Sequence, residues 1–139
     1  MVELQAHHFG LIVEDLKESL AFYRDTLGLE VAAEFTLDGE GIATAIGVED
    51  VTAKFAHLDA GGARIELVEY EPAGEAVRAE TVNQLGSKHA GFEVDDIDAF
   101  YESLPESAAP IAEPQRTQSG SRIIFFEDPD GNLLEVVST

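Results

Sequence analysis

Cysteine is absent from this sequence of 139 residues, and so is tryptophan. Without thiols the chain can form neither a disulfide nor a thiolate metal site. Long hydrophobic runs are also absent, and none approaches the roughly 20 apolar residues of a membrane-spanning helix. The N-terminal residues lack the basic and then apolar pattern of a signal peptide. We therefore expect a cytoplasmic protein with no membrane partner.

Basic residues are scarce: 8 lysines and arginines face 28 aspartates and glutamates, for a net charge of −20. Nucleic acids and anionic membranes are bound through basic surfaces, so neither is an expected partner. Such a charge destabilises a compact fold unless salt screens it. Our hypothesis is a halophilic protein of a salt-rich cytoplasm; the alternative is an acidic protein kept soluble by its charge. A melting temperature that does not rise between low and molar salt would contradict the hypothesis.

An internal repeat organises the chain. The segments 8–16 and 89–97 align without a gap. The matching positions are His8 with His89, Gly10 with Gly91, Val13 with Val94, and Asp15 with Asp96. Because 45% of the residues are hydrophobic, each copy has enough apolar side chains for a folded core.

Each repeat leads into a pattern of helical spacing, with Asp15 and Asp96 at the expected N-caps. Gly28 should end the first helix and Pro105 the second. Further runs have strand-like composition. The expected strands after the helices are 29–35, 52–58, 64–68, 111–113, 122–127 and 132–137. The chain is thus predicted to be an α+β protein of two tandem βαβββ modules, about 4–70 and 86–138, joined by a connector at about 71–85, within one domain spanning 1–139.

Strand alternation places one histidine and one glutamate of each module on the face away from its helix. Carboxylates on such a face need a partner, and a metal ion is one. Nitrogen and oxygen donors suit nickel, zinc, cobalt, manganese or iron(II). His7 and His57 have no counterpart in the repeat, so we interpret His57 as an edge or pocket residue. The predicted metal ligands are His8, Glu66, His89 and Glu135.

Asp128, Asp130 and Asn132 superficially resemble a calcium loop. The remaining ligand positions of that loop are missing, and Pro129 and Gly131 favour a tight turn. We therefore predict a turn before the last strand and no calcium site.

At these residues the sequence resembles the vicinal oxygen chelate superfamily, which includes glyoxalase I, bleomycin-resistance proteins and extradiol dioxygenases. The resemblance covers about residues 4–138. It rests on the His8 repeat, on the helix text 19–29, on Gly86-Ser87-Lys88-His89, and on the stretch from Glu127 to Glu135. The resemblance implies curved mixed sheets that enclose a metal cleft, and a homodimer.

Glyoxalase I members carry His, Glu, His and Glu ligands in the order found here. The resemblance therefore implies a divalent-metal-dependent lyase or isomerase, similar to lactoylglutathione lyase. Its small-molecule substrate would be the hemithioacetal of a 2-oxoaldehyde and a thiol, converted through an enediolate. Glu135 is the first candidate for the catalytic base and Glu66 the second. The alternatives are a methylmalonyl-CoA-type epimerase, an extradiol-type dioxygenase, and a non-catalytic binding protein whose cleft is lined by Ile12 and Phe126.

Overall fold

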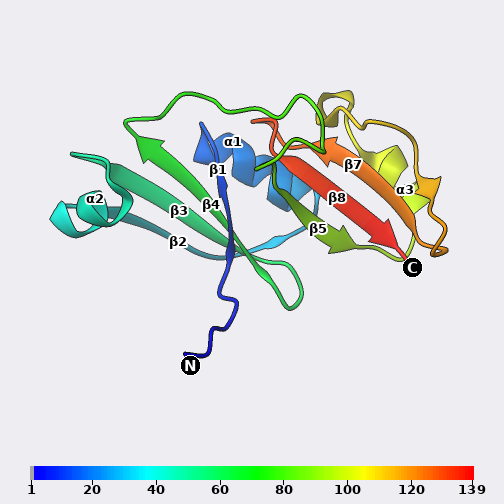
Figure 1. Cartoon of the computed structure of the whole chain (residues 1–139), viewed down its shortest axis with the longest axis horizontal. Coiled ribbons are helices and arrows are strands. Elements are labelled where there is room, and N and C mark those ends of the chain that lie inside the picture. The colour runs from blue at the N-terminus through cyan, green and yellow to red at the C-terminus, as the bar shows by residue number, and fades with distance from the viewer. Residues whose placement is uncertain (1) are drawn as a thin grey trace. The chain divides into compact units, whose positions relative to one another are not determined.

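The computed structural model describes residues 2–139. The chain divides into two compact units, the first ending at Glu75 and the second spanning Ala76–Thr139. Each unit is a four-stranded mixed sheet with helical segments (Figure 1). Within residues 2–139, the helices are all too short or too polar to cross a membrane.

The first sheet has the strand order β1-β4-β3-β2, in which β1 runs parallel to β4 and the other neighbours are antiparallel. A helix lies between β1 and β2 in the chain, and a second helix follows β2. The elements are β1 (Phe9–Ile12), α1 (Leu16–Leu20), the π-helical η1 (Ala21–Thr26), β2 (Glu30–Asp38), α2 (Glu40–Ile46), β3 (Thr52–Asp59) and β4 (Arg64–Glu71).

The second sheet repeats this topology with the order β5-β8-β7-β6, and β5 is again parallel to β8. Its elements are β5 (His89–Glu93), α3 (Ile97–Ser103), the 3-10 helix η2 (Glu106–Ala108), β6 (Gln115–Arg116), β7 (Arg122–Glu127) and β8 (Leu133–Ser138). The predicted α+β class and the repeated strand, helix and three strands are therefore confirmed.

Aspartate caps begin the first helix of each unit, as predicted. The Asp15 carboxylate accepts from the backbone N–H of Glu18 at 3.1 Å, and Asp96 accepts from Ala99 at 3.0 Å. These bonds satisfy amide groups that have no partner within the helix. Gly28 follows η1 with a φ of 76°, a left-handed conformation that glycine adopts without strain.

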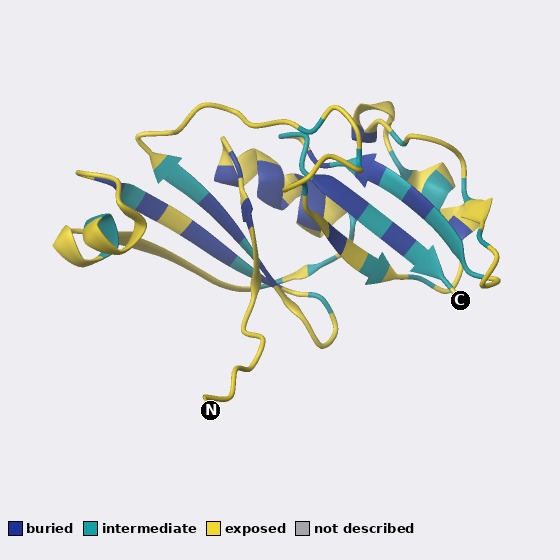
Figure 2. Cartoon of the chain, in the orientation of Figure 1, coloured by how far each residue is buried: buried dark blue, intermediate teal, exposed yellow. Residues whose placement is uncertain are grey.

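Buried residues alternate with less buried ones along much of β4 and β7, whereas the edge strand β2 is exposed over nearly all its length (Figure 2). In the first sheet the face covered by α1 includes Leu11, Leu58, Ile65 and Leu67, all buried. In the second sheet Ile124, Phe126, Leu134 and Val136 are buried on the face toward α3. Glu66 and Glu135 stand between these apolar positions and therefore project to the opposite faces.

Several boundaries differ from the prediction. The segment 111–113 is not a strand, and a two-residue strand, β6, lies at Gln115–Arg116 instead. A single backbone bond, from the N–H of Ile111 to the carbonyl of Phe125 at 3.0 Å, ties this segment to β7. The prolines at 110 and 114 have no N–H to extend a ladder, which explains the interruption. The helix α2 was not expected; it is only seven residues long and buries none of them.

Candidate functional site

Glu66 lies in the middle of β4, paired with Gly10 of β1 on one side and His57 of β3 on the other. The His57 Nε2 atom is 2.7 Å from Glu66 Oε2, and the His8 Nε2 atom is 3.4 Å from Glu66 Oε1. Each carboxylate oxygen therefore faces a different histidine. The side chains of His57 and Glu66 are each only 13% exposed, so water screens their interaction weakly.

One phenylalanine packs against the His57 ring, and a second packs against the first. The ring of Phe35 on β2 meets the imidazole edge to face, with centroids 5.1 Å apart and an interplanar angle of 88°. Phe35 in turn stacks on Phe55 at 4.9 Å and 11°. Phe55 is buried in a small cluster with Ala53 and Val68 on this face of the sheet. The imidazole is thus fixed by packing as well as by its polar contact.

Glu135 occupies the same position in the second sheet. It lies in β8 between Gly91 of β5 and Phe125 of β7. The His89 Nε2 atom is 3.4 Å from Glu135 Oε1. A Cβ atom placed on Gly91 would lie 3.6 Å from the same Oε1 atom, so glycine keeps this oxygen clear of a neighbouring side chain. The ring of Phe125 contacts His89 instead, at 5.1 Å and 75°.

The structure therefore brings the predicted ligands together in two pairs, His8 with Glu66 and His89 with Glu135, with the same separation of 3.4 Å. Over residues 2–139, no cluster of three or more His, Asp or Glu side chains forms a ready-made metal site. The joining of all four residues around one ion stays a prediction. His7 contacts His8, with their Nδ1 atoms 2.8 Å apart.

His57 is the site residue that sequence reasoning undervalued, because the repeat has phenylalanine at its counterpart, Phe125. The position of the β3–β4 turn nevertheless indicates that His57 pairs with Glu66. The turn around Gly61 and Gly62 lies midway between His57 and Glu66, and antiparallel strands pair residues that are equally far from their turn. Counting outward from that turn places the two side chains opposite each other.

Phe126 was expected to line a cleft, and this prediction was wrong. Its side chain is 0% exposed and packs against Phe100 of α3, with ring centroids 5.6 Å apart. Because successive residues of a strand face opposite ways, Phe125 is the residue on the Glu135 face. Ile12, the other predicted lining residue, is exposed at the end of β1.

Neither Glu66 nor Glu135 forms an ion pair with a lysine or arginine in the part of the chain that the structure describes. Lys54, Arg24, Arg78 and Arg122 pair with other carboxylates. Burial raises the pKa of the Tyr70 hydroxyl, and the negative charge of Glu66 raises it further. Tyr70 is therefore a neutral phenol at physiological pH, beside a carboxylate whose polar contacts are with histidines.

The acidic stretch before β8 is a turn, as predicted. The buried carboxylate of Asp128 accepts from the backbone N–H groups of Asp130 and Asn132 at 2.9 and 2.8 Å. The Asn132 side chain donates to the other carboxylate oxygen at 2.9 Å. These oxygens thus serve the turn, whose Gly131 has a φ of 82°.

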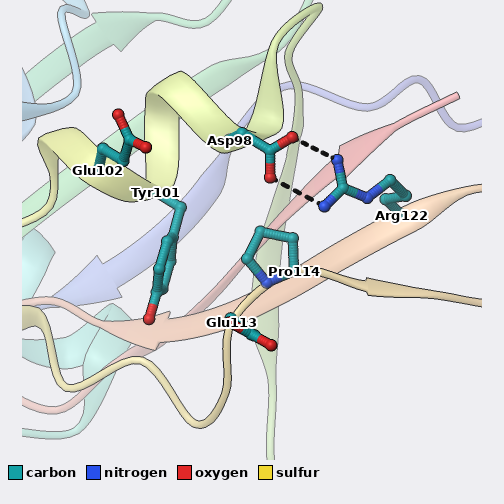
Figure 3. Close-up of a pocket in the computed structure, with 6 residues that line it drawn as sticks. All are labelled: Asp98, Tyr101, Glu102, Glu113, Pro114 and Arg122. Carbon is teal, nitrogen blue, oxygen red and sulfur yellow. Dashed lines mark hydrogen bonds and ion pairs between the residues drawn. The ribbon is translucent and has the colours of Figure 1, made fainter.

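A separate hollow of about 330 Å³ lies on the α3 side of the second sheet (Figure 3). Arg122 closes one side through two bonds to the Asp98 carboxylate, at 2.7 and 2.8 Å. Because Arg122 points to the helix face of β7, this hollow is on the opposite face from Glu135. Its lining residues are Asp98, Tyr101, Glu102, Glu113, Pro114 and Arg122.

Comparison with known proteins agrees with this architecture. The chain is 36% identical to YaeR of Escherichia coli (strain K12), over 95% of this chain and 94% of YaeR. It is 30% identical to YraH of Bacillus subtilis (strain 168), over 91% of both chains. An ethylmalonyl-CoA/methylmalonyl-CoA epimerase of Cereibacter sphaeroides is 29% identical over 91% of this chain and 90% of its own.

A crystal structure of a glyoxalase family protein from Bacillus cereus superposes with a TM-score of 0.84. It is 23% identical, and the match covers 99% of this chain and 95% of that one. Residues 5–136 match the sequence profile of the glyoxalase/bleomycin resistance protein/dioxygenase superfamily. This match spans both repeats and all four predicted ligands. The chain therefore belongs to the glyoxalase/bleomycin resistance protein/dioxygenase superfamily.

Proposed function

We propose that this protein is a divalent-metal-dependent, glyoxalase-like lyase or isomerase that acts on the hemithioacetal of a 2-oxoaldehyde and a thiol. The proposed metal ligands are His8, Glu66, His89 and Glu135. The observation that carries the proposal is the repeated pair of one imidazole Nε2 and one carboxylate oxygen, 3.4 Å apart in each unit.

The geometry of each pair fits a role as ligands. A separation of 3.4 Å exceeds the 2.7–3.2 Å of a good N–H···O hydrogen bond, so the two groups of a pair only partly satisfy each other. Both Nε2 and Oε1 remain suited to a third group. Two imidazole nitrogens and two carboxylate oxygens, with no thiolate, suit zinc, nickel, cobalt, manganese or iron(II). Each unit alone supplies too few donors, so the proposal requires both pairs.

The proposed reaction moves a proton between adjacent carbons of the substrate. A bound divalent ion supplies positive charge near the oxygens on which negative charge develops. The Glu135 carboxylate takes the proton from one carbon and returns it to the next, acting as general base and then as general acid. Gly91 leaves the Glu135 oxygen accessible from the β5 side, and Phe125 provides an apolar wall on the β7 side.

An epimerase is the second candidate, because the relative from Cereibacter sphaeroides carries that name and matches over 91% of this chain. Inversion of a carbon beside a thioester needs the same removal and return of a proton. The two functions differ in the substrate and in which face of the carbanion receives the proton. The ligand set would be the same in both, but inversion also needs a second group that delivers a proton to the opposite face of the carbon.

The test combines metal analysis with a substrate panel. We expect about one tightly held divalent ion per chain. We also expect turnover of methylglyoxal with one member of a panel of thiols, and its loss after chelation. The double substitution His8→Ala with His89→Ala should abolish metal binding, whereas the control Glu102→Gln, on the helix side of the second sheet, should retain it. Turnover of methylmalonyl-CoA alone would establish the epimerase. A purified protein that holds no divalent ion, and whose properties chelators do not change, would contradict both enzymes and indicate a binding protein.

A further inference from the structure

We propose that His57 is a positioning residue: it holds the Glu66 carboxylate in one orientation, so that Glu66 serves only as a ligand while Glu135 remains free to move the proton. This inference rests on the proposed function. It assigns a role to a histidine outside the repeat and explains how two equivalent glutamates take different parts.

The contact between His57 and Glu66 is short enough for a strong hydrogen bond. The 2.7 Å between His57 Nε2 and Glu66 Oε2 is within the range of a charge-assisted N–H···O bond. An ionised carboxylate can only accept, so the proton lies on Nε2 and the imidazole donates it. This bond occupies Oε2 and directs Oε1 toward His8 Nε2, 3.4 Å away. The proposed ligand oxygen is thereby chosen before any ion arrives.

The donor, the His57 imidazole, is also fixed by packing. The His57 ring contacts the Glu66 carboxylate and also packs at nearly a right angle to Phe35, which stacks on the buried Phe55. A carboxylate bonded to a fixed donor loses much of its freedom to rotate. Hydrogen bonds to metal ligands act in this way in many metal sites, and their loss weakens metal binding about 10- to 100-fold.

Glu135 in the second unit has no residue equivalent to His57. Phe125 stands where His57 would be, in register with Glu135 as His57 is with Glu66. A phenyl ring offers the carboxylate no N–H group, and here it packs on His89 instead. Among the described residues, the polar side chain that faces Glu135 is His89 alone. Glu135 therefore keeps the rotational freedom that a proton-shuttling group needs.

The experiment replaces the His57 imidazole with two other side chains. His57→Phe gives the first unit the residue that the second unit already accommodates, and His57→Gln retains an N–H donor. Affinity for cobalt(II) would be measured by competition with a chelator, together with the visible absorption of the cobalt protein. We expect His57→Phe to weaken binding about 10- to 100-fold and to alter the spectrum, and His57→Gln to restore most of both. Circular dichroism would verify that both variants fold.

The metal-free protein provides a second readout. Nitrogen-15 NMR should show that the His57 ring carries its proton on Nε2. This proton should be protected from exchange with water in wild type, and the protection should be lost in Glu66→Ala. A His57→Phe variant that binds cobalt as tightly as wild type, with the same spectrum, would overturn the positioning role while leaving the proposed function intact. A proton on Nδ1 would overturn it as well. Failure of wild type to bind any divalent ion would instead contradict the proposed function, and the NMR result would then decide the His57–Glu66 bond by itself.

Discussion

Glu66 and Glu135 occupy the same position in two sheets of the same topology, yet their surroundings differ. Each is paired across the parallel side with a glycine and lies 3.4 Å from a histidine. Across the antiparallel side, one faces His57 and the other Phe125. The repeat has thus kept the donor pairs and changed the residue beside them. We expect this difference of one side chain to give the two carboxylates the separate roles proposed above.

The largest expected effect comes from removing each carboxylate in turn. If Glu135 moves the proton, Glu135→Gln should lower kcat by about 10²- to 10⁴-fold, as expected for loss of a general base. Glu66→Gln should mainly weaken metal binding and should leave a larger fraction of kcat when the metal is saturating. Steady-state kinetics with metal titration measures both.

Glu102→Gln on α3, on the helix side of the second sheet, is the control for a general loss of negative charge. Equal losses of kcat for the two site variants at saturating metal would remove the proposed division of roles.

Core truncation tests whether the two sheets are equally well packed. Ile65 and Leu134 hold equivalent positions on the helix faces and are both buried. Replacing either with alanine should lower the free energy of unfolding by about 2–5 kcal/mol, because a buried aliphatic side chain leaves a cavity. Leu134, the more fully buried, should be the more costly.

Urea unfolding measures both variants, with Val77→Ala at an exposed position as the control. A cost for Leu134→Ala no greater than that of the control would mean that the second core is not as closely packed as its burial indicates.

Removing the helix N-caps should have a smaller effect, of similar size in the two units. Asp15→Ala and Asp96→Ala should each lower the free energy of unfolding by about 1 kcal/mol, because each removes one carboxylate bond to a helix amide. Asp15→Asn and Asp96→Asn should recover most of that loss, since asparagine also caps. Thermal unfolding is a suitable measurement, and caps of clearly unequal value would show that the two helix starts have diverged as the sites have.

The smallest effect concerns one surface ion pair in each unit. Bonding to Arg24 lowers the pKa of Asp25, and bonding to Arg122 lowers the pKa of Asp98, both below the usual 3.8. A carboxylate with a lowered pKa adds stability above its usual pKa and loses it as the pH falls through the lowered value. These groups are exposed, so the contribution should be slight.

Carbon-13 NMR titration should place both midpoints below 3.8, and Arg24→Gln or Arg122→Gln should return its own aspartate toward that value. A midpoint for Asp98 that Arg122→Gln leaves unchanged would show that the pair does not persist in solution.

Much of the fold follows from local signals in the sequence. The capping aspartates, the glycine after the first helix and the alternation along β4 and β8 each act within a few residues, so the chain text reveals them. The repeat then selected Glu66 and Glu135. The same reliance on the repeat concealed His57, because a residue that breaks the repeat is invisible to an argument from symmetry. The placement of Phe126 failed for a simpler reason: its neighbour Phe125 has the same side chain, and only the strand register separates them.

Features without a local signal could not be predicted. The helix α2 is short and buries no residue, so the core provides no constraint from which it could be inferred. The π-helical winding of η1, which buries Phe22 and Tyr23, has no local pattern that distinguishes it from an α-helix. The short β6 depends on which residues of the preceding segment can reach β7, which is a tertiary condition.

The strand β2 has a consequence for handling the protein. It ends the first sheet, and its residues are largely exposed, among them Phe35 and Leu37. An open strand edge with apolar side chains is a template for aggregation. Glu30, Glu34 and Asp38 place negative charge along the same strand, so two copies repel each other. Protonation of these carboxylates removes that repulsion, and we expect precipitation to set the acid limit for storage before unfolding does.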